Sequence, residues 1–175
     1  MRFRTTSILT LSCALMELLI CFPSRAAQVE KDSPPKRFVD IGACPFECCT
    51  YRLWTANDSV QLVDRAQGKR VIATLHKGEA VQGLTGEVIS TPLAAKASHD
   101  IPETPIKAGD TFYVLHYDGE GYWKVWFRGK TTYVHESVMD LPHPKTEWWV
   151  KVKRRDGAIG WTLSGEHFLH QDACE

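Results

Sequence analysis

Hydrophobic and polar residues alternate in short runs along the chain after Tyr51, and turn-forming residues separate these runs. Successive side chains of a strand point to opposite faces, so the alternation predicts half-buried strands. Glycine, aspartate and proline between the runs are typical of the turns that join short strands. No helical period of useful length interrupts the series, which predicts an all-β fold. We expect strands at residues 59–64, 70–75, 80–90, 111–117, 122–127, 131–135, 148–153 and 159–163.

Two segments break this pattern. Residues 28–43 are charged and contain the pair Pro34-Pro35, which indicates a linker or an extended arm. Residues 92–105 combine alanine, proline and charged residues without alternation, and we expect a loop there.

Two internal repeats organise the predicted strands. The first relates residues 75–84 to residues 106–115, matching Leu75, Gly78, Glu79, Val81 and Leu84 with Ile106, Gly109, Asp110, Phe112 and Leu115. The second relates residues 122–133 to residues 149–161, matching Tyr122, Lys124, Val125, Gly129 and Tyr133 with Trp149, Lys151, Val152, Gly157 and Trp161.

Both copies of the first repeat precede both copies of the second, and this order predicts that one unit is inserted in another. Residues 106–133 contain one copy of each repeat and form a compact unit. The first copy of the first repeat, near residues 60–88, must then combine with the last copy of the second, in residues 147–164, on the other side of that unit. Such nesting brings the chain ends together, and a tandem arrangement is the alternative. The expected parts are a signal peptide at 1–26, a linker and cysteine-rich arm at 27–50, an outer unit at 51–90 plus 145–175, and an inserted unit at 91–144.

The repeated motifs resemble those of the bacterial Src-homology-3-like (SH3-like) domain family of exported and cell-wall proteins. "HKGEAV" and "KAGDTF" match the family's Lys-Gly-Glu/Asp run, and "WVKV" and "YWKV" match its Trp-x-Lys-Val element. "GAIGWT" and "GKTTYV" match its Gly-x-x-Gly-Tyr/Trp-Val turn, although Thr132 replaces the second glycine in the inner copy. The resemblance covers roughly residues 58–165. It implies small SH3-like barrels that bind peptides, glycan strands or partner proteins and do not catalyse reactions.

The N-terminus has the pattern of an export signal. An apolar run at residues 5–22 follows a basic start, and the small residues Ser24 and Ala26 predict cleavage after Ala26. Glu17 interrupts the apolar run, and a retained N-terminal anchor is the alternative. We therefore expect a periplasmic or extracellular protein, and no later run approaches the length of a membrane span.

The expected leader holds three arginines and one glutamate, so the 21 basic and 21 acidic residues of the chain become 18 and 20 after cleavage. This near balance of charges, without a basic block, argues against nucleic acid as a partner.

Four cysteines remain after the leader, at Cys44, Cys48, Cys49 and Cys174. In an oxidising compartment they predict disulfides, with three possible connectivities. The adjacent Cys48 and Cys49 cannot easily pair with each other, and we expect a bond from the cluster to Cys174.

The strand at residues 122–127 carries the candidate binding surface. Its alternation places Trp123, Val125 and Phe127 on one face, which we expect to be core. The opposite face presents two aromatic and two cationic side chains, suited to stacking on a peptide or sugar while pairing with a carboxylate. The candidate ligand-binding residues are Tyr122, Lys124, Trp126 and Arg128, with Trp149 beside Lys151 and Lys153 as a second possible stacking surface. The alternative is that these aromatic side chains only pack against the rest of the protein.

Metal binding and catalysis are weaker interpretations of the same sequence. His167, His170, Asp172 and Cys174 have the residue types of a zinc site, but thiols of an exported protein oxidise. Cys48 would be the candidate nucleophile if another cysteine paired with Cys174, yet no histidine is marked as its base. We therefore expect no metal, no cofactor and no enzymatic activity.

Together these patterns predict an exported, non-enzymatic SH3-like binding protein of the bacterial cell envelope. Its expected ligand is peptidoglycan or a peptide, held in an aromatic and basic groove. The alternative is a structural or assembly protein that binds another envelope protein.

Overall fold

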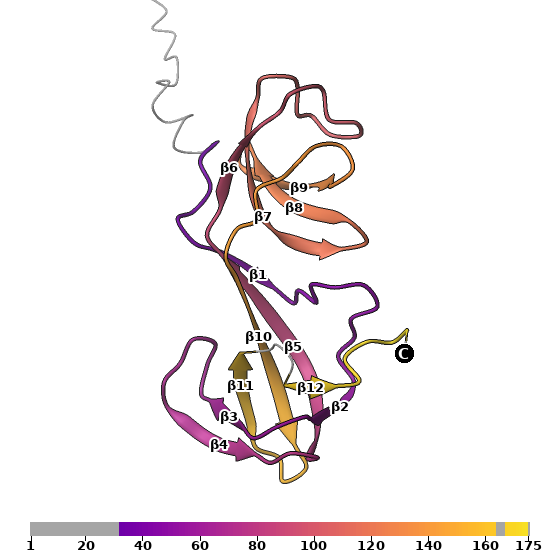
Figure 1. The fold of residues 1–175 in the computed structure, drawn as a ribbon. Coiled ribbons are helices and arrows are strands. Elements are labelled where there is room, and N and C mark those ends of the chain that lie inside the picture. The colour runs from indigo at the N-terminus through magenta and orange to yellow at the C-terminus, as the bar shows by residue number, and fades with distance from the viewer. Residues whose placement is uncertain (1–31, 164–166, 175) are drawn as a thin grey trace, which may run out of the picture.

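The computed structural model describes residues 32–163 and 167–174, and the chain there is organised in two β-sheets (Figure 1). Every assigned element is a strand, in agreement with the predicted all-β class. The predicted signal peptide lies outside the described residues. Within the described part, no helix has the length and apolar character needed to cross a membrane.

The first sheet is curled and combines strands from both ends of the described chain. Its strand order is β12-β2-β5-β10-β11-β3-β4, and β1 pairs with β5 beside this path. Its strands are β1 (Phe38–Ile41), β2 (Leu53–Ala56), β3 (Val60–Val63), β4 (Val71–Leu75), β5 (Ala80–Ser90), β10 (Thr146–Arg154), β11 (Ile159–Leu163) and β12 (Phe168–Leu169).

The core of the first sheet joins residues that are distant in the sequence. Trp54 and Leu75 are fully buried together with Val150 and Val152 of β10. Trp148 packs at the border of this cluster, as its alternation with Val150 and Val152 predicts. Residues before 90 and after 145 therefore share one hydrophobic core.

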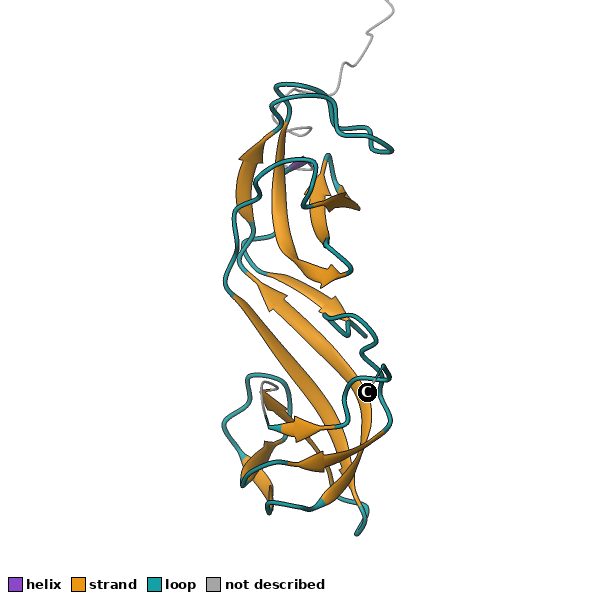
Figure 2. Cartoon of the chain, turned by 45° about the vertical axis from the view of Figure 1, so that its right-hand side comes forward, coloured by secondary structure: helices purple, strands orange, loops and turns teal. Residues whose placement is uncertain are grey.

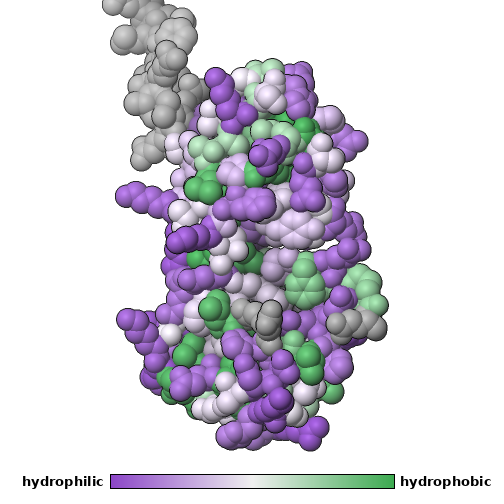
Figure 3. All heavy atoms as spheres, viewed as in Figure 1, coloured by the Kyte–Doolittle hydropathy of each residue, from purple (hydrophilic) through white to green (hydrophobic). Residues whose placement is uncertain are grey.

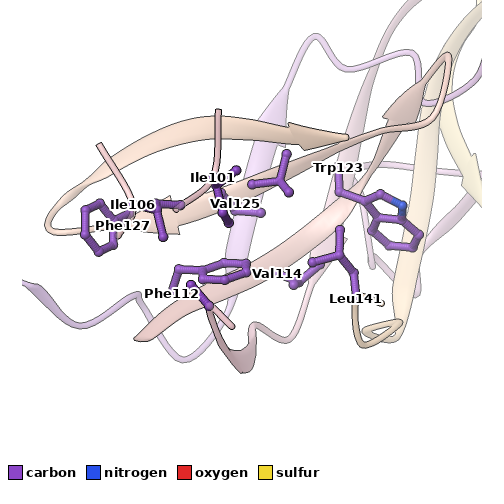
Figure 4. Packing of buried hydrophobic residues seen from close by; sticks show 10 residues of the cluster. Ile101, Ile106, Phe112, Val114, Trp123, Val125, Phe127 and Leu141 are labelled. Atoms are coloured by element: carbon purple, nitrogen blue, oxygen red, sulfur yellow. The ribbon is translucent and has the colours of Figure 1, made fainter. Parts of the chain in front are cut away.

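The second sheet is formed by the intervening segment, in the order β6-β7-β8-β9. Its strands are β6 (Leu93–Lys96), β7 (Thr111–Gly119), β8 (Tyr122–Phe127) and β9 (Lys130–His135). Trp123, Val125 and Phe127 are buried in its core, as expected, where they meet side chains from β7 and from the loops (Figure 4). These partners include Ile101, Ile106, Phe112, Val114 and Leu141.

The long antiparallel pair of β5 and β10 connects the two sheets. It runs along the molecule from one sheet toward the other, and the chain leaves it after Ser90 and returns at Thr146 (Figures 1 and 2). Seen from the side of Figure 1, apolar atoms form separate groups among hydrophilic ones, so this view shows no single large apolar surface (Figure 3).

The predicted strands are present, with small differences at their ends, but four further strands are not among them. Residues 92–105 were expected to be a loop, and this expectation is wrong at β6, which pairs with β7 along its length. Strands β1, β2 and β12 each pair with a strand far away in the sequence. Strand β1 lies in the expected extended arm. The assignment of the two sheets to SH3-like barrels stays a prediction.

Two disulfides fasten the cysteine-rich segment, which we call the cysteine loop (residues 44–49). Cys44 bonds to Cys49, and Cys48 bonds to Cys174 across 126 positions of the sequence. The expected link from the cluster to Cys174 is thus confirmed, with Cys48 as the partner. Backbone hydrogen bonds from Thr50 to Gln171 (2.9 Å) and from Ala173 to Cys48 (2.8 Å) reinforce it. The two disulfides are compatible with an exported, oxidising location.

We expect loss of the Cys48–Cys174 bond to be far more costly than loss of the Cys44–Cys49 bond. In the chain-entropy description, closing the long loop stabilises the fold by about 5 kcal/mol and closing the short one by about 2 kcal/mol. Denaturant unfolding of the Cys48→Ser/Cys174→Ser and Cys44→Ser/Cys49→Ser variants measures both losses. Equal losses in the two variants would contradict this prediction.

Candidate functional site

The outer face of β8 lies opposite the core of the second sheet, and β8 has β7 on one side and β9 on the other. Tyr122 pairs with His135, Lys124 with Tyr133, and Trp126 with Thr131. Because antiparallel partners project to the same side, the tyrosines of both strands share one face. The structure thus places Tyr122, Lys124 and Trp126 on one surface, as the alternation predicts.

Lys124 on this surface is bound to the first sheet. Its ammonium group donates a hydrogen bond to Asp40 of β1 and lies 4.0 Å from Asp118. Only 14% of the Lys124 side chain and 18% of the Asp40 side chain are exposed. Strand β1 belongs to the first sheet, so this ion pair joins the two sheets.

His116 of β7, the cross-strand partner of Lys124, also contacts Asp40. Its side chain is 1% exposed, and its Nε2 lies 2.8 Å from Asp40 Oδ2. Its Nδ1 lies 2.7 Å from the carbonyl oxygen of Tyr117. Asp40 therefore has two partners from the second sheet, His116 and Lys124. We call these three residues the Asp40 cluster.

The Asp40 cluster changes the acidity of its members. Burial raises the pKa of Asp40, but the hydrogen bonds and charges of His116 and Lys124 outweigh it and hold this pKa below the usual 3.8. Burial lowers the pKa of Lys124, whereas the hydrogen bond and charge of Asp40 act more strongly in the other direction and leave it raised above 10.5. Both groups are therefore held in their charged forms.

Trp126 and Arg128 also contact partners within the chain. The indole N–H of Trp126 donates to the carbonyl oxygen of Asp32 (3.0 Å), and the ring meets Phe38 edge-on at 6.5 Å. Arg128 forms an ion pair with Asp110 at 3.2 Å, although its side chain is largely exposed. The two cations expected to meet a ligand carboxylate thus already pair with carboxylates of the protein.

A cleft of about 480 Å³ opens between the cysteine loop and the second sheet. Residues 46–49 line one side, and residues 118–120 with Tyr122 and Tyr133 line the other. Gly119 permits the close approach of the two sides, because its φ is +111° and an added Cβ would lie 3.3 Å from the backbone nitrogen of Glu47. The ring of Phe46 packs edge-on against Trp148 at 5.5 Å, which fixes the loop to the first sheet.

Tyr122 and Tyr133 are the aromatic side chains most available in this cleft, at 45% and 44% exposure. They also border a second hollow of about 280 Å³, which residues 101–104 and His135 help to line. The ring of His135 meets Tyr122 edge-on at 4.9 Å. The two tyrosines therefore form an aromatic surface between two depressions.

Trp149 lies apart from this surface, on β10 of the first sheet. Its indole N–H donates to Glu147 Oε2 at 2.9 Å. It borders a separate hollow of about 330 Å³ together with Gln61, Leu163 and His167. The structure therefore does not bring Trp149 together with Tyr122, Lys124, Trp126 and Arg128.

The residues considered for zinc or catalysis occupy other positions. Cys48, Asp172 and Cys174 gather closely, but both cysteines are disulfide-bonded and carry no free thiolate. His167 pairs with Asp58 at 3.0 Å and lies apart from this group. A second group, Asp40, His116 and Asp118, surrounds the ammonium of Lys124, which supplies the positive charge there.

The sequence pattern alone did not identify Asp40, His116, Phe46 or Tyr133 as parts of a site. Tyr133 has a usable signal, because its alternation on β9 places it beside Lys124. Asp40 has none, since 84 positions separate it from Lys124. Comparison with known protein families, curated proteins and solved structures finds no match for this chain.

We expect Asp40→Asn to lower the free energy of unfolding by about 3 kcal/mol at pH 7, since Lys124 then keeps a buried charge without its main partner. A carboxyl group whose pKa is depressed by folding stabilises the protein above its unfolded pKa and loses this effect as the pH falls through the folded value. The difference between wild type and variant should therefore shrink below about pH 4. Urea unfolding between pH 2.5 and 7 measures it.

Asp140→Asn is the matched control, because it removes one carboxylate from an exposed position. Its effect should stay within about 0.5 kcal/mol at every pH. A similar loss in both variants, or a difference at Asp40 that persists unchanged at low pH, would show that the Asp40 cluster does not stabilise the fold.

Proposed function

We propose that this protein is an exported, non-enzymatic binding protein of the bacterial cell envelope, built from two SH3-like units. Its ligand is peptidoglycan or a peptide, which lies across Tyr122 and Tyr133 and into the cleft beside the cysteine loop. The observation that carries the proposal is the exposure of two tyrosine rings on one face, between two depressions.

Aromatic rings with exposed faces favour binding of extended polymers. They offer a large contact area at a small entropic cost, and they stack on sugars and on peptide groups. The face is also held rigidly, because the Asp40 cluster fixes β8 to the first sheet. A rigid surface loses less conformational entropy on binding than a mobile one.

The proposed groove differs from the one expected from the sequence. Tyr122 remains its central residue and Tyr133 joins it, whereas Lys124 and Arg128 support the surface through ion pairs within the protein. Trp126 fastens the N-terminal arm to the same face through Asp32 and Phe38. Export is supported by the predicted leader and by the two disulfides.

A second candidate function is assembly with another envelope protein. Exposed leucines on neighbouring strands of the first sheet favour it: Leu53 on β2 and Leu169 on β12 are 61% and 47% exposed. Apolar side chains in such a position suit a protein interface. In this case crosslinking in cells would capture one dominant protein partner, with no association with the wall.

We expect Tyr122→Ala/Tyr133→Ala to weaken strongly the sedimentation of the protein with purified cell-wall sacculi. Each ring lost from a stacking contact costs about 1 kcal/mol or more, so the pair reduces affinity by roughly tenfold to a hundredfold. Tyr122→Phe/Tyr133→Phe is the matched control, because it keeps both rings, and it should retain most of the binding. Circular dichroism checks that both variants fold.

Undiminished sedimentation of the alanine variant would exclude the tyrosine face as the binding site. If the wild type does not sediment with sacculi at all, the wall polymer is excluded as the ligand. Crosslinking to a single protein would then favour the assembly function.

A further inference from the structure

The cleft beside the cysteine loop is acidic. Three carboxylates line it, from Glu47, Asp118 and Glu120, and no cationic side chain is among its lining residues. Glu47 and Glu120 are exposed, and within residues 32–163 and 167–174 neither forms an ion pair. The nearest cation to Asp118 is Lys124 at 4.0 Å, and Lys124 is bound more closely by Asp40. The cleft therefore carries a net negative charge.

The same cleft is aromatic on both sides. Phe46 lies in the cysteine loop, and Tyr122 and Tyr133 face it from the second sheet. Aromatic faces attract cations, and the protein already uses one of them in this way, because the ammonium of Lys124 lies 5.4 Å from the ring centre of Tyr133. Carboxylates at the edge of such rings add a direct charge attraction.

This combination is unfavourable for an anionic ligand group. A ligand carboxylate in the cleft would meet three like charges, while Lys124 and Arg128 already pair with Asp40 and Asp110. A cation gains from both the rings and the carboxylates. The volume of about 480 Å³ accommodates a side chain of several carbon atoms with its neighbouring peptide groups.

We propose that the cleft recognises a primary ammonium group of its ligand, the side-chain amine of a diamino residue in the wall peptide. The inference rests on the proposed function and specifies the part of the ligand that this site selects. Glu47 and Glu120 pair with the ammonium from the two sides of the cleft, and Phe46, Tyr122 and Tyr133 surround its alkyl chain. The rest of the polymer extends over the tyrosine face toward the second hollow.

The test compares native sacculi with sacculi whose free amines have been acetylated, which removes the positive charge. The wild-type protein should bind acetylated sacculi roughly five- to tenfold more weakly than native ones. Glu47→Gln/Glu120→Gln should bind native sacculi as weakly as the wild type binds acetylated ones, and acetylation should cause it little further loss. Binding of the wild type to native sacculi should also weaken with added salt.

Glu87→Gln/Asp140→Asn is the matched control, because it removes two carboxylates outside the cleft and should keep the full response to acetylation. Equal binding of the wild type to native and acetylated sacculi would overturn the ammonium inference and leave the proposed function intact. A response to acetylation that Glu47→Gln/Glu120→Gln shares in full would also overturn it, since the amine is then recognised elsewhere. Absence of any sedimentation of the wild type would reject the proposed wall-binding function itself, and the inference with it.

Discussion

The pairing of β5 with β10 is the constraint on which the rest of the structure depends. Its register places Trp148 opposite Val88 and Val152 opposite Gly83, so residues from both ends of the described chain are aligned along one ladder. This alignment brings Leu75 and Val152 into one core. It also fixes where the chain leaves the first sheet to build the second. The tyrosine face and the cleft are therefore located by a contact that none of their own residues makes.

Within this frame, the Asp40 cluster sets the character of the candidate site. A single carboxylate from β1 takes up the charge of Lys124 and a hydrogen bond from buried His116, which holds the second sheet against the first. The same contact removes Lys124 from the set of cations that a ligand could reach. An interaction that stabilises the arrangement of the sheets thus also engages the cation nearest the cleft, whose own lining contributes three carboxylates and no cation.

The sequence predicted what depends on local alternation and missed what depends on distant pairing. Strand β5 and the buried face of β8 follow from period-two patterns, and the bond from the cysteine cluster to Cys174 follows because the adjacent Cys48 and Cys49 cannot easily pair with each other. Strand β6 carries no alternation that a sequence pattern would detect. Its residues form a strand because they pair with β7. Likewise, Lys124 has the same local pattern whether it is free or paired, so its bond to Asp40 could not be predicted.

The cysteine loop is both a covalent tie and a wall of the cleft. Cys48 and Cys49 line the cleft, and each belongs to a different disulfide. A newly made chain with reduced thiols lacks both ties, so Glu47 and Phe46 are not yet fastened opposite the tyrosines. Oxidation of the four cysteines is therefore also the step that fastens one wall of the cleft, so the proposed binding surface is complete only after both disulfides have formed.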